Sequence, residues 1–204
     1  MSISRAQAQA LADGFINSIG SGSQSDLQPR ETFTEIILIA GELVEDAQKN
    51  LKKAGSVSSG DLSSSIETNE PVLKGSILEI DIFMNRYGLF VNKGVKGTKS
   101  GHSKAGYKFT KAGPSKAFVE SIQAWIKRGG LKSTNVKRSV SKHESKNKSI
   151  AEISSAYAVS RSIMQKGIKG NGFFDKAAKT AVKKVGSRLG AALKIDVITS
   201  ISRA

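Results

Sequence analysis

The amino-acid sequence predicts an α+β fold in which a small antiparallel sheet packs on several helices and carries long basic loops. The sheet is indicated by residues 74–93, where apolar and polar side chains alternate at the period of a half-buried strand. The helices are indicated by longer stretches with an apolar residue every three or four positions. Stretches rich in glycine and lysine separate these elements and indicate loops.

Two helices are predicted ahead of the sheet. Residues 4–19 place their apolar side chains on one face of a short helix. A second helix is predicted over 30–55, with Thr32 as its N-cap and Glu35 completing a capping box. Glu45 has a lysine four residues later, a spacing that favours an ion pair on a helix surface.

The sheet itself is predicted as a hairpin over 74–93. Its first strand alternates through 78–84, a turn follows at 85–86, and the second strand returns through 87–91. A short flanking strand is expected at 64–68, after a serine-rich turn. We expect the hairpin to pack on the second and fifth helices.

Three further helices and a final strand are predicted. The helices cover about 115–128, 149–166 and 173–193, where apolar residues recur at helical spacing. Residues 193–203 are rich in β-branched side chains and predict a strand at the edge of the sheet. Glycine pairs and glycine-rich turns separate these elements.

The length of 204 residues predicts one domain with an extension. Residues 1–30 are predicted as a helical N-terminal extension, and residues 31–204 as a single α+β domain with basic loops at 92–116 and 129–149. The chain contains no cysteine, which excludes disulfides and thiolate chemistry. Its longest apolar run is far too short to span a bilayer, so no membrane partner is expected.

The net charge of +15 is distributed unevenly along the chain. Residues 1–90 carry 7 Lys and Arg against 12 Asp and Glu, whereas 91–150 carry 15 against 2 and 151–204 carry 10 against 3. A basic block of this kind favours nucleic acid, an anionic surface or an acidic partner; the alternative is a solvated loop without a partner. Tyr107 and Phe109 lie among its lysines, a mixture that suits base stacking and phosphate contact.

No catalytic, cofactor-binding or metal site is predicted, and the chain is not expected to be an enzyme. The two histidines, His102 and His143, lie in polar basic stretches and form no Ser-His-Asp arrangement in the sequence. No paired carboxylates stand in an apolar setting, and no P-loop pattern is present. We therefore expect no cofactor.

Three short patterns occur in order along the chain. AGSVSSGDLSSSI at 54–66 joins a helix end to small residues, YGLFVNKGVKG at 87–97 places an aromatic residue and an apolar pair before glycine, and GIKGNGFFDKA at 167–177 joins a glycine turn to a helix. In this order they resemble the neck or tail-completion family of tailed bacteriophages, small proteins that join head to tail. The chain departs from the family pattern at Asp61 and Lys93.

The resemblance implies a structural virion protein that assembles in the cytoplasm of a bacterial host. Such a protein forms part of the neck, a head–tail connector ring that joins the portal or its adaptor to the tail and surrounds the DNA channel. Its partners would be further copies of itself in a homo-oligomeric ring, the neighbouring neck, portal-adaptor and tail proteins, and non-specifically bound DNA in the lumen. The alternative function is that of a nucleic-acid-binding accessory protein that uses the basic loops.

The same resemblance assigns hypothetical roles to charged residues. Lysines of the first basic loop would face the DNA channel or a neighbouring ring: Lys93, Lys96, Lys99, Lys104, Lys108, Lys111 and Lys116. Glu42 and Glu45 of one copy would meet Lys179 and Lys183 of the next copy in a head-to-tail contact between subunits.

Overall fold

The computed structural model describes residues 3–18, 29–74, 77–99, 106–111, 113–128 and 148–202. The chain gathers into two compact units, which we call the first unit (Met1–Val57, Asp61–Asn85 and Phe173–Ala204) and the second unit (Ser58–Gly60 and Arg86–Gly172). The predicted domain at 31–204 thus contributes to two units, and the helix of the predicted extension at 1–30 belongs to the first.

The described part of the first unit contains α1 (Arg5–Ser18), α2 (Arg30–Lys53), α3 (Asp61–Ser64), β1 (Glu67–Thr68), β2 (Val72–Lys74), β3 (Ile77–Glu79), β4 (Ile82–Phe83) and α7 (Phe173–Ile201). The described part of the second unit contains α4 (Gly88–Lys93), β5 (Gly94–Lys96), β6 (Tyr107–Lys108), α5 (Lys116–Lys127), α6 (Lys148–Lys166) and β7 (Gly167–Lys169). These elements confirm the predicted α+β class. They also confirm, to within a few residues, the helices predicted at 4–19, 30–55, 115–128 and 149–166.

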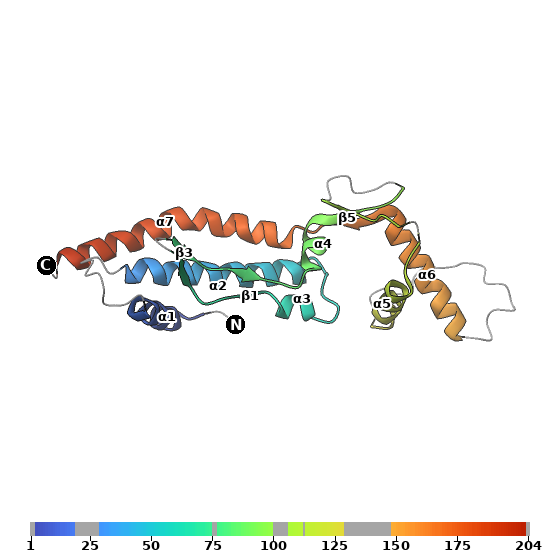
Figure 1. Ribbon diagram of the computed structural model, residues 1–204, viewed down its shortest axis with the longest axis horizontal. Helices are drawn as coiled ribbons and strands as arrows, with labels where there is room; N and C mark the ends of the chain where they lie inside the picture. Colours follow the sequence, from blue (N-terminus) through green and yellow to red (C-terminus); the bar gives the residue numbers. More distant parts are fainter. Residues whose placement is uncertain are drawn as a thin grey trace. The chain divides into compact units, whose positions relative to one another are not determined.

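The first unit is built on the antiparallel pair of α2 and α7, which lie side by side (Figure 1). At one end of the pair, Asn50 Nδ2 donates to the Phe173 carbonyl at 3.1 Å. At the other end, the backbone N–H of Glu31 donates to the Asp196 carboxylate at 2.9 Å. Small side chains from α7 let the two helices approach closely. The buried residues of α7 are Phe173, Ala177, Ala181, Ala192 and Asp196.

α1 packs on the first half of α2. Ala8 and Ala12 are fully buried and form a small apolar core with Ile37 of α2. The rings of Phe15 and Phe33 meet edge to face, with their centroids 5.2 Å apart. The apolar residues of α1 therefore recur at helical spacing because one side of the helix faces this core.

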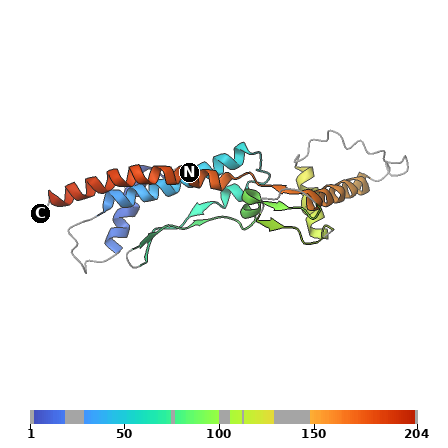
Figure 2. The ribbon, with the colours of Figure 1, turned by 90° about the horizontal axis from the view of Figure 1, so that it is seen from above.

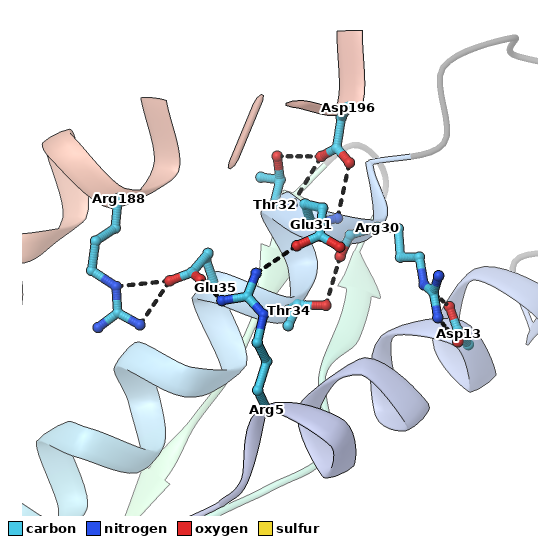
Figure 3. Close-up of polar contacts among 9 residues, drawn as sticks. All are labelled: Arg5, Asp13, Arg30, Glu31, Thr32, Thr34, Glu35, Arg188 and Asp196. Carbon is cyan, nitrogen blue, oxygen red and sulfur yellow. Dashed lines mark hydrogen bonds and ion pairs between the residues drawn. The ribbon is translucent and has the colours of Figure 1, made fainter. Parts of the chain in front are cut away.

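A side chain from α7 caps the N-terminus of α2 (Figure 3). The Asp196 carboxylate accepts hydrogen bonds from the backbone N–H groups of Glu31 and Thr32, both at 2.9 Å, and from the Thr32 hydroxyl at 2.7 Å. The prediction that Thr32 is the N-cap is wrong: Thr32 lies inside the first turn, and the N-cap residue, Pro29, makes no side-chain cap bond. The carboxylate also compensates the positive end of the helix dipole.

Glu35, predicted to complete a local capping box, instead joins α2 to both neighbouring helices (Figure 3). Its carboxylate accepts hydrogen bonds from Arg5 of α1 at 2.9 Å and from Arg188 of α7 at 2.7 Å. Arg188 also donates to Glu42 at 2.6 Å, and Lys184 donates to the other oxygen of Glu42 at 2.7 Å. The side of α7 that carries these two cations is thus neutralised by α2 within the same chain.

The strands of the first unit form two short antiparallel ladders along one side of the α2–α7 pair (Figure 2). β1 pairs with β4, and β2 pairs with β3. Between the ladders, the Asn69 N–H donates to the Asp81 carbonyl at 3.1 Å, and the Asp81 N–H donates to Asn69 Oδ1 at 2.6 Å. Ile80, between β3 and β4, packs on the apolar core of α1 and α2.

The hairpin predicted over 74–93 is only partly correct. The observed hairpin pairs β2 with β3, so it lies earlier in the chain and overlaps only the start of the predicted range, while β3 and β4 together cover most of the predicted first strand. The predicted second strand at 87–91 is wrong, because these residues lead into and form α4. Gly88 and Asn92 are both buried, and their spacing of four residues places them on the same face of a helix. The apolar run between them is too short to distinguish a strand from a helix. The strand predicted at 64–68 is limited to β1, because α3 precedes it.

The strand predicted at 193–203 is also wrong, because α7 continues to Ile201. β-branched residues lower helix propensity only slightly, so packing can override them. Ala192 and Asp196 are buried four residues apart in this stretch, and the contact of Asp196 with α2 holds it in helical register.

In the second unit, β5 lies between β6, to which it is parallel, and β7, to which it is antiparallel. α5 packs on α6, and Ser115 caps α5 by accepting a hydrogen bond from the Phe118 N–H at 3.3 Å. α6 buries Ala156, Ser160 and Met164, which recur every four residues on one side of the helix. Because α6 continues directly into β7, the helix fixes the position of that edge strand.

Asp196→Ala is expected to lower the free energy of unfolding of the first unit by about 1–3 kcal/mol, because it leaves partly buried N–H groups of α2 without an acceptor. Urea unfolding followed by far-UV circular dichroism measures the loss. Asp13→Ala is the matched control: Asp13 pairs with Arg30 at 2.6 Å between half-exposed side chains, so its removal should cost less than about 1 kcal/mol. Equal losses in both variants would contradict the capping role.

Acidification is expected to destabilise the first unit through Glu42. Partial burial raises the pKa of Glu42, but hydrogen bonds from Lys184 and Arg188 outweigh it and hold the pKa below its ordinary value of 4.5. The resulting stabilisation is complete above about pH 4.5 and is lost as the pH falls through the folded pKa. Urea unfolding at a series of pH values should show this decline, and Glu42→Gln should flatten it. A decline of unchanged steepness in the variant would refute the assignment to Glu42.

Candidate nucleic-acid interface

The positive charge of the chain belongs to the second unit. Its residues include 19 Lys and Arg against 3 Asp and Glu, a net charge of +16, whereas the first unit has 13 against 14, a net charge of −1. From the sequence alone, the excess of positive charge extends over the whole chain after residue 90. The structure shows that α7 belongs to the first unit, where acidic residues balance its cations. A charge of this size in one compact unit favours a polyanionic ligand.

Three lysines lie on one face of the sheet of the second unit. We call Lys96, Lys108 and Lys169 the lysine face. The register pairs Lys96 with Lys108 across β5 and β6, and Gly94 with Lys169 across β5 and β7. Because side chains alternate along a strand, these three lysines point to one side of the sheet. Val95 and its register partners on the two neighbouring strands point to the other side. All three lysines are exposed.

Glycine is required where β5 meets β7. Gly94 and Gly167 have φ values of 82° and 85°, which residues with a side chain rarely adopt. A Cβ at Gly94 would lie 2.5 Å from a carbonyl oxygen of β7, and a Cβ at Gly167 would collide with a carbonyl oxygen of β5. These glycines are the register partners of Lys169 and Lys96, so the residue opposite each of these two lysines has no side chain.

Lys96 and Lys108 repel each other across the sheet. Register partners on neighbouring strands lie about 4.8 Å apart, and like charges at such positions destabilise a sheet. Within the described ranges, no residue of the lysine face has an ion-pair partner. A bound anion would relieve this repulsion. The arrangement therefore favours an external anion, such as a phosphate group, over internal pairing.

The structure brings only part of the predicted lysine set together. Lys96 and Lys108 are neighbours on the sheet, and Lys104 lies outside the described residues. The others are exposed on separate elements: Lys93 at the end of α4, Lys99 after β5, Lys111 after β6, and Lys116 at the start of α5, 4.0 Å from Glu120.

Lys169 is absent from the predicted set. A repeated motif could have indicated it, because G-x-K-G occurs as GVKG at 94–97 and as GIKG at 167–170. Three residues of each copy pair in the sheet as β5 and β7. Nothing local in the sequence shows that two segments so far apart are neighbours, so the repeat becomes informative only once the fold is known.

The aromatic residues of the basic loop have partners inside the second unit. The ring of Tyr107 meets Phe90 edge to face, with centroids 4.7 Å apart, and Phe109 lies 6.4 Å from Phe118. Tyr107 is also the register partner of Val95, on the side of the sheet away from the lysine face. The base stacking suggested by the sequence is therefore less favoured than phosphate contact.

The residues predicted to form a subunit interface have different surroundings. Glu42 is already paired with two cations of its own α7. Glu45 lies 3.6 Å from Lys49, which confirms the ion pair expected from their spacing. Lys179 and Lys183 are exposed on α7. The contact of these residues with another copy stays a prediction.

Lys108→Glu is expected to change stability and anion binding in opposite directions. It replaces a repulsive pair with an attractive one, so the second unit should gain roughly 0.2–1 kcal/mol in free energy of unfolding, while its affinity for DNA falls. Trp125, the only tryptophan, lies in α5, so its fluorescence follows unfolding of the second unit. Lys179→Glu makes the same charge change on α7 and should leave the Trp125 transition unchanged. A second unit that is less stable with Lys108→Glu would show that the repulsion is unimportant.

Among the described residues, no group of three or more His, Cys, Asp or Glu side chains could hold a metal ion, and His102 and His143 fall outside this part of the chain. No helix in the described ranges is both long and apolar enough to cross a membrane. Comparisons with protein-family models, curated proteins and solved structures found no match to this chain.

Proposed function

We propose that this protein is a structural component of a tailed-bacteriophage virion, in the neck or head–tail connector ring that joins the portal or its adaptor to the tail. The observation that carries the proposal is the lysine face on a compact unit of net charge +16. The resemblance of three ordered sequence patterns to the neck family supports it. In this role the protein contacts DNA through the second unit.

Phosphate contact is the chemistry that suits the lysine face. Lysines that bind phosphates position DNA without reading its sequence. The nearby aromatic rings are engaged with other rings of the chain, which favours backbone contact over stacking on single-stranded bases. This suits a duplex that passes through a channel whatever its sequence.

A ring strengthens such contacts by repetition. Each copy presents the same lysine face, and linked weak sites raise the effective concentration of their neighbours. A single copy is expected to bind with the affinity typical of non-specific contact, a dissociation constant of about 10⁻⁴–10⁻⁶ M at physiological salt. The other partners in this proposal are neighbouring copies and the adjacent neck, portal-adaptor and tail proteins.

Replacing Lys96 and Lys108 together with glutamine is expected to weaken DNA binding and to reduce its salt dependence. The slope of log K against log salt concentration should become shallower by about 2, because each lost phosphate contact removes about 0.9. Fluorescence anisotropy of a labelled duplex at several salt concentrations measures the slope.

Lys179→Gln with Lys183→Gln is the matched control, since it removes two exposed cations from the first unit. It should leave the slope close to that of the unchanged protein. Equal effects of the two double variants would mean that net charge acts without a defined face, and the proposal would lose its main support.

A second candidate function is that of a nucleic-acid-binding accessory protein. It is favoured by the fact that one chain supplies all three strands that carry the lysine face. The two functions differ in how binding depends on assembly. Binding by the isolated monomer that is tighter than about 10⁻⁶ M at physiological salt favours the accessory protein, whereas weaker binding by the monomer that strengthens on ring formation favours the neck protein.

A further inference from the structure

The C-terminal end of α7 carries apolar side chains that the described part of the first unit leaves exposed. α7 continues past the first turn of α2 and projects beyond it (Figures 1 and 2). We call residues 193–201 the α7 tip. A cluster of exposed apolar side chains marks a contact with another macromolecule. The exposed fractions are 46% at Leu193, 49% at Ile195, 39% at Val197, 52% at Ile198 and 71% at Ile201.

One side of the α7 tip combines apolar and positive groups. Lys194, Ile198 and Ile201 follow one another at spacings of four and three, so they share a side of the helix. Lys194 is exposed, and the described residues offer it no ion-pair partner. A surface that fits this side of the tip therefore needs an apolar hollow with a carboxylate at its edge.

The first unit contains a hollow of this kind. It is a groove of about 210 Å³ between α1, α2 and the segments around β1 and β3. Its volume is below the roughly 300–1,000 Å³ typical of small-molecule sites, so it fits aliphatic side chains better than a cofactor. Glu70 is exposed at this groove and has no ion-pair partner in the described ranges. The apolar lining comes from Ile3, Leu11, Ile37, Ala40, Pro71 and Ile80.

The α7 tip cannot occupy the groove of its own chain. Asp196 is bonded to Glu31 and Thr32 at the start of α2, whereas Ile37 and Ala40 line the groove further along that helix. Because α2 and α7 are antiparallel, the residues that follow Asp196 run away from Ala40. An α7 tip that fills this groove must therefore belong to another molecule.

We propose that the α7 tip of one copy docks in the groove of a second copy of this chain, with Ile198 and Ile201 in the groove and Lys194 beside Glu70. The inference rests on the proposed function, because it supplies the contact between adjacent copies in the ring. Tip and groove are different surfaces, so the contact is head-to-tail, and its repetition forms a closed ring when the rotation between copies permits. The charge pair at the edge of the groove orients the tip.

Single-cysteine variants test this contact directly, because the chain contains no cysteine. Ile198→Cys and Pro71→Cys are expected to form a mixed disulfide when the two proteins are combined and oxidised, since docking brings the two side chains within bonding reach, about 3.5–4.5 Å between Cβ atoms. Val182→Cys is the matched control for Ile198→Cys: Val182 is 71% exposed on the same helix but lies outside the α7 tip. It should give only background cross-linking with Pro71→Cys.

The outcomes separate the docking from the proposed function. Absence of the Ile198→Cys cross-link, or equal cross-linking by Val182→Cys, overturns the docking. DNA binding by the same proteins is measured in parallel, because the lysine face lies in the other unit. Lysine-dependent DNA binding by an oligomer without the cross-link overturns the docking alone. A protein that stays monomeric and does not bind DNA overturns both.

Charge reversal tests the pair at the edge of the groove. Glu70→Lys or Lys194→Glu alone is expected to weaken self-association by up to about fivefold, and the two reversals in one protein should restore it. Sedimentation velocity over a concentration series measures the association. Failure of the double variant to recover overturns the Lys194–Glu70 pair, and unchanged association with Ile198→Asp overturns the docking as a whole.

Discussion

The contact between Asp196 and the first turn of α2 is the constraint on which the first unit depends. Glu31 and Asp196 are 165 residues apart in the chain, so the α2–α7 pair closes only after the segment that carries Asp196 has been made. α1, β1 and Ile80 pack on α2, which is their common support. The segment from Arg86 to Gly172 leaves this pair and folds into a unit with its own sheet.

The pairing of α2 with α7 also determines where the charge of the molecule resides. Glu35 and Glu42 bind cations of α7, which leaves the first unit near neutrality. In the second unit, few carboxylates are available, and the sheet holds two lysines in register. A sheet that tolerates such repulsion gives up stability for a local arrangement of charge, which is typical of functional sites.

The sequence predicted the long helices well, because their amphipathic period extends over many residues. Contacts between distant segments left no local signal. A plausible capping box at Thr32 was displaced by a carboxylate 164 residues further on, and Lys169 became part of the site only through pairing with β5. α4 was missed because a run of three apolar residues fits a strand equally well. Lys96 and Lys108 were correctly placed in a basic region, but their shared register required the fold.

The lysine face brings together three segments that are separate in the chain, so it exists only when the second unit is folded. A polyanion that recognises it therefore binds the folded form and shifts the folding equilibrium by mass action. At a ligand concentration 100 times the dissociation constant, this shift amounts to about 2.7 kcal/mol. In the proposed neck, DNA would act on every copy as a folding ligand. Copies left outside a particle would unfold more readily, and proteases could clear them first.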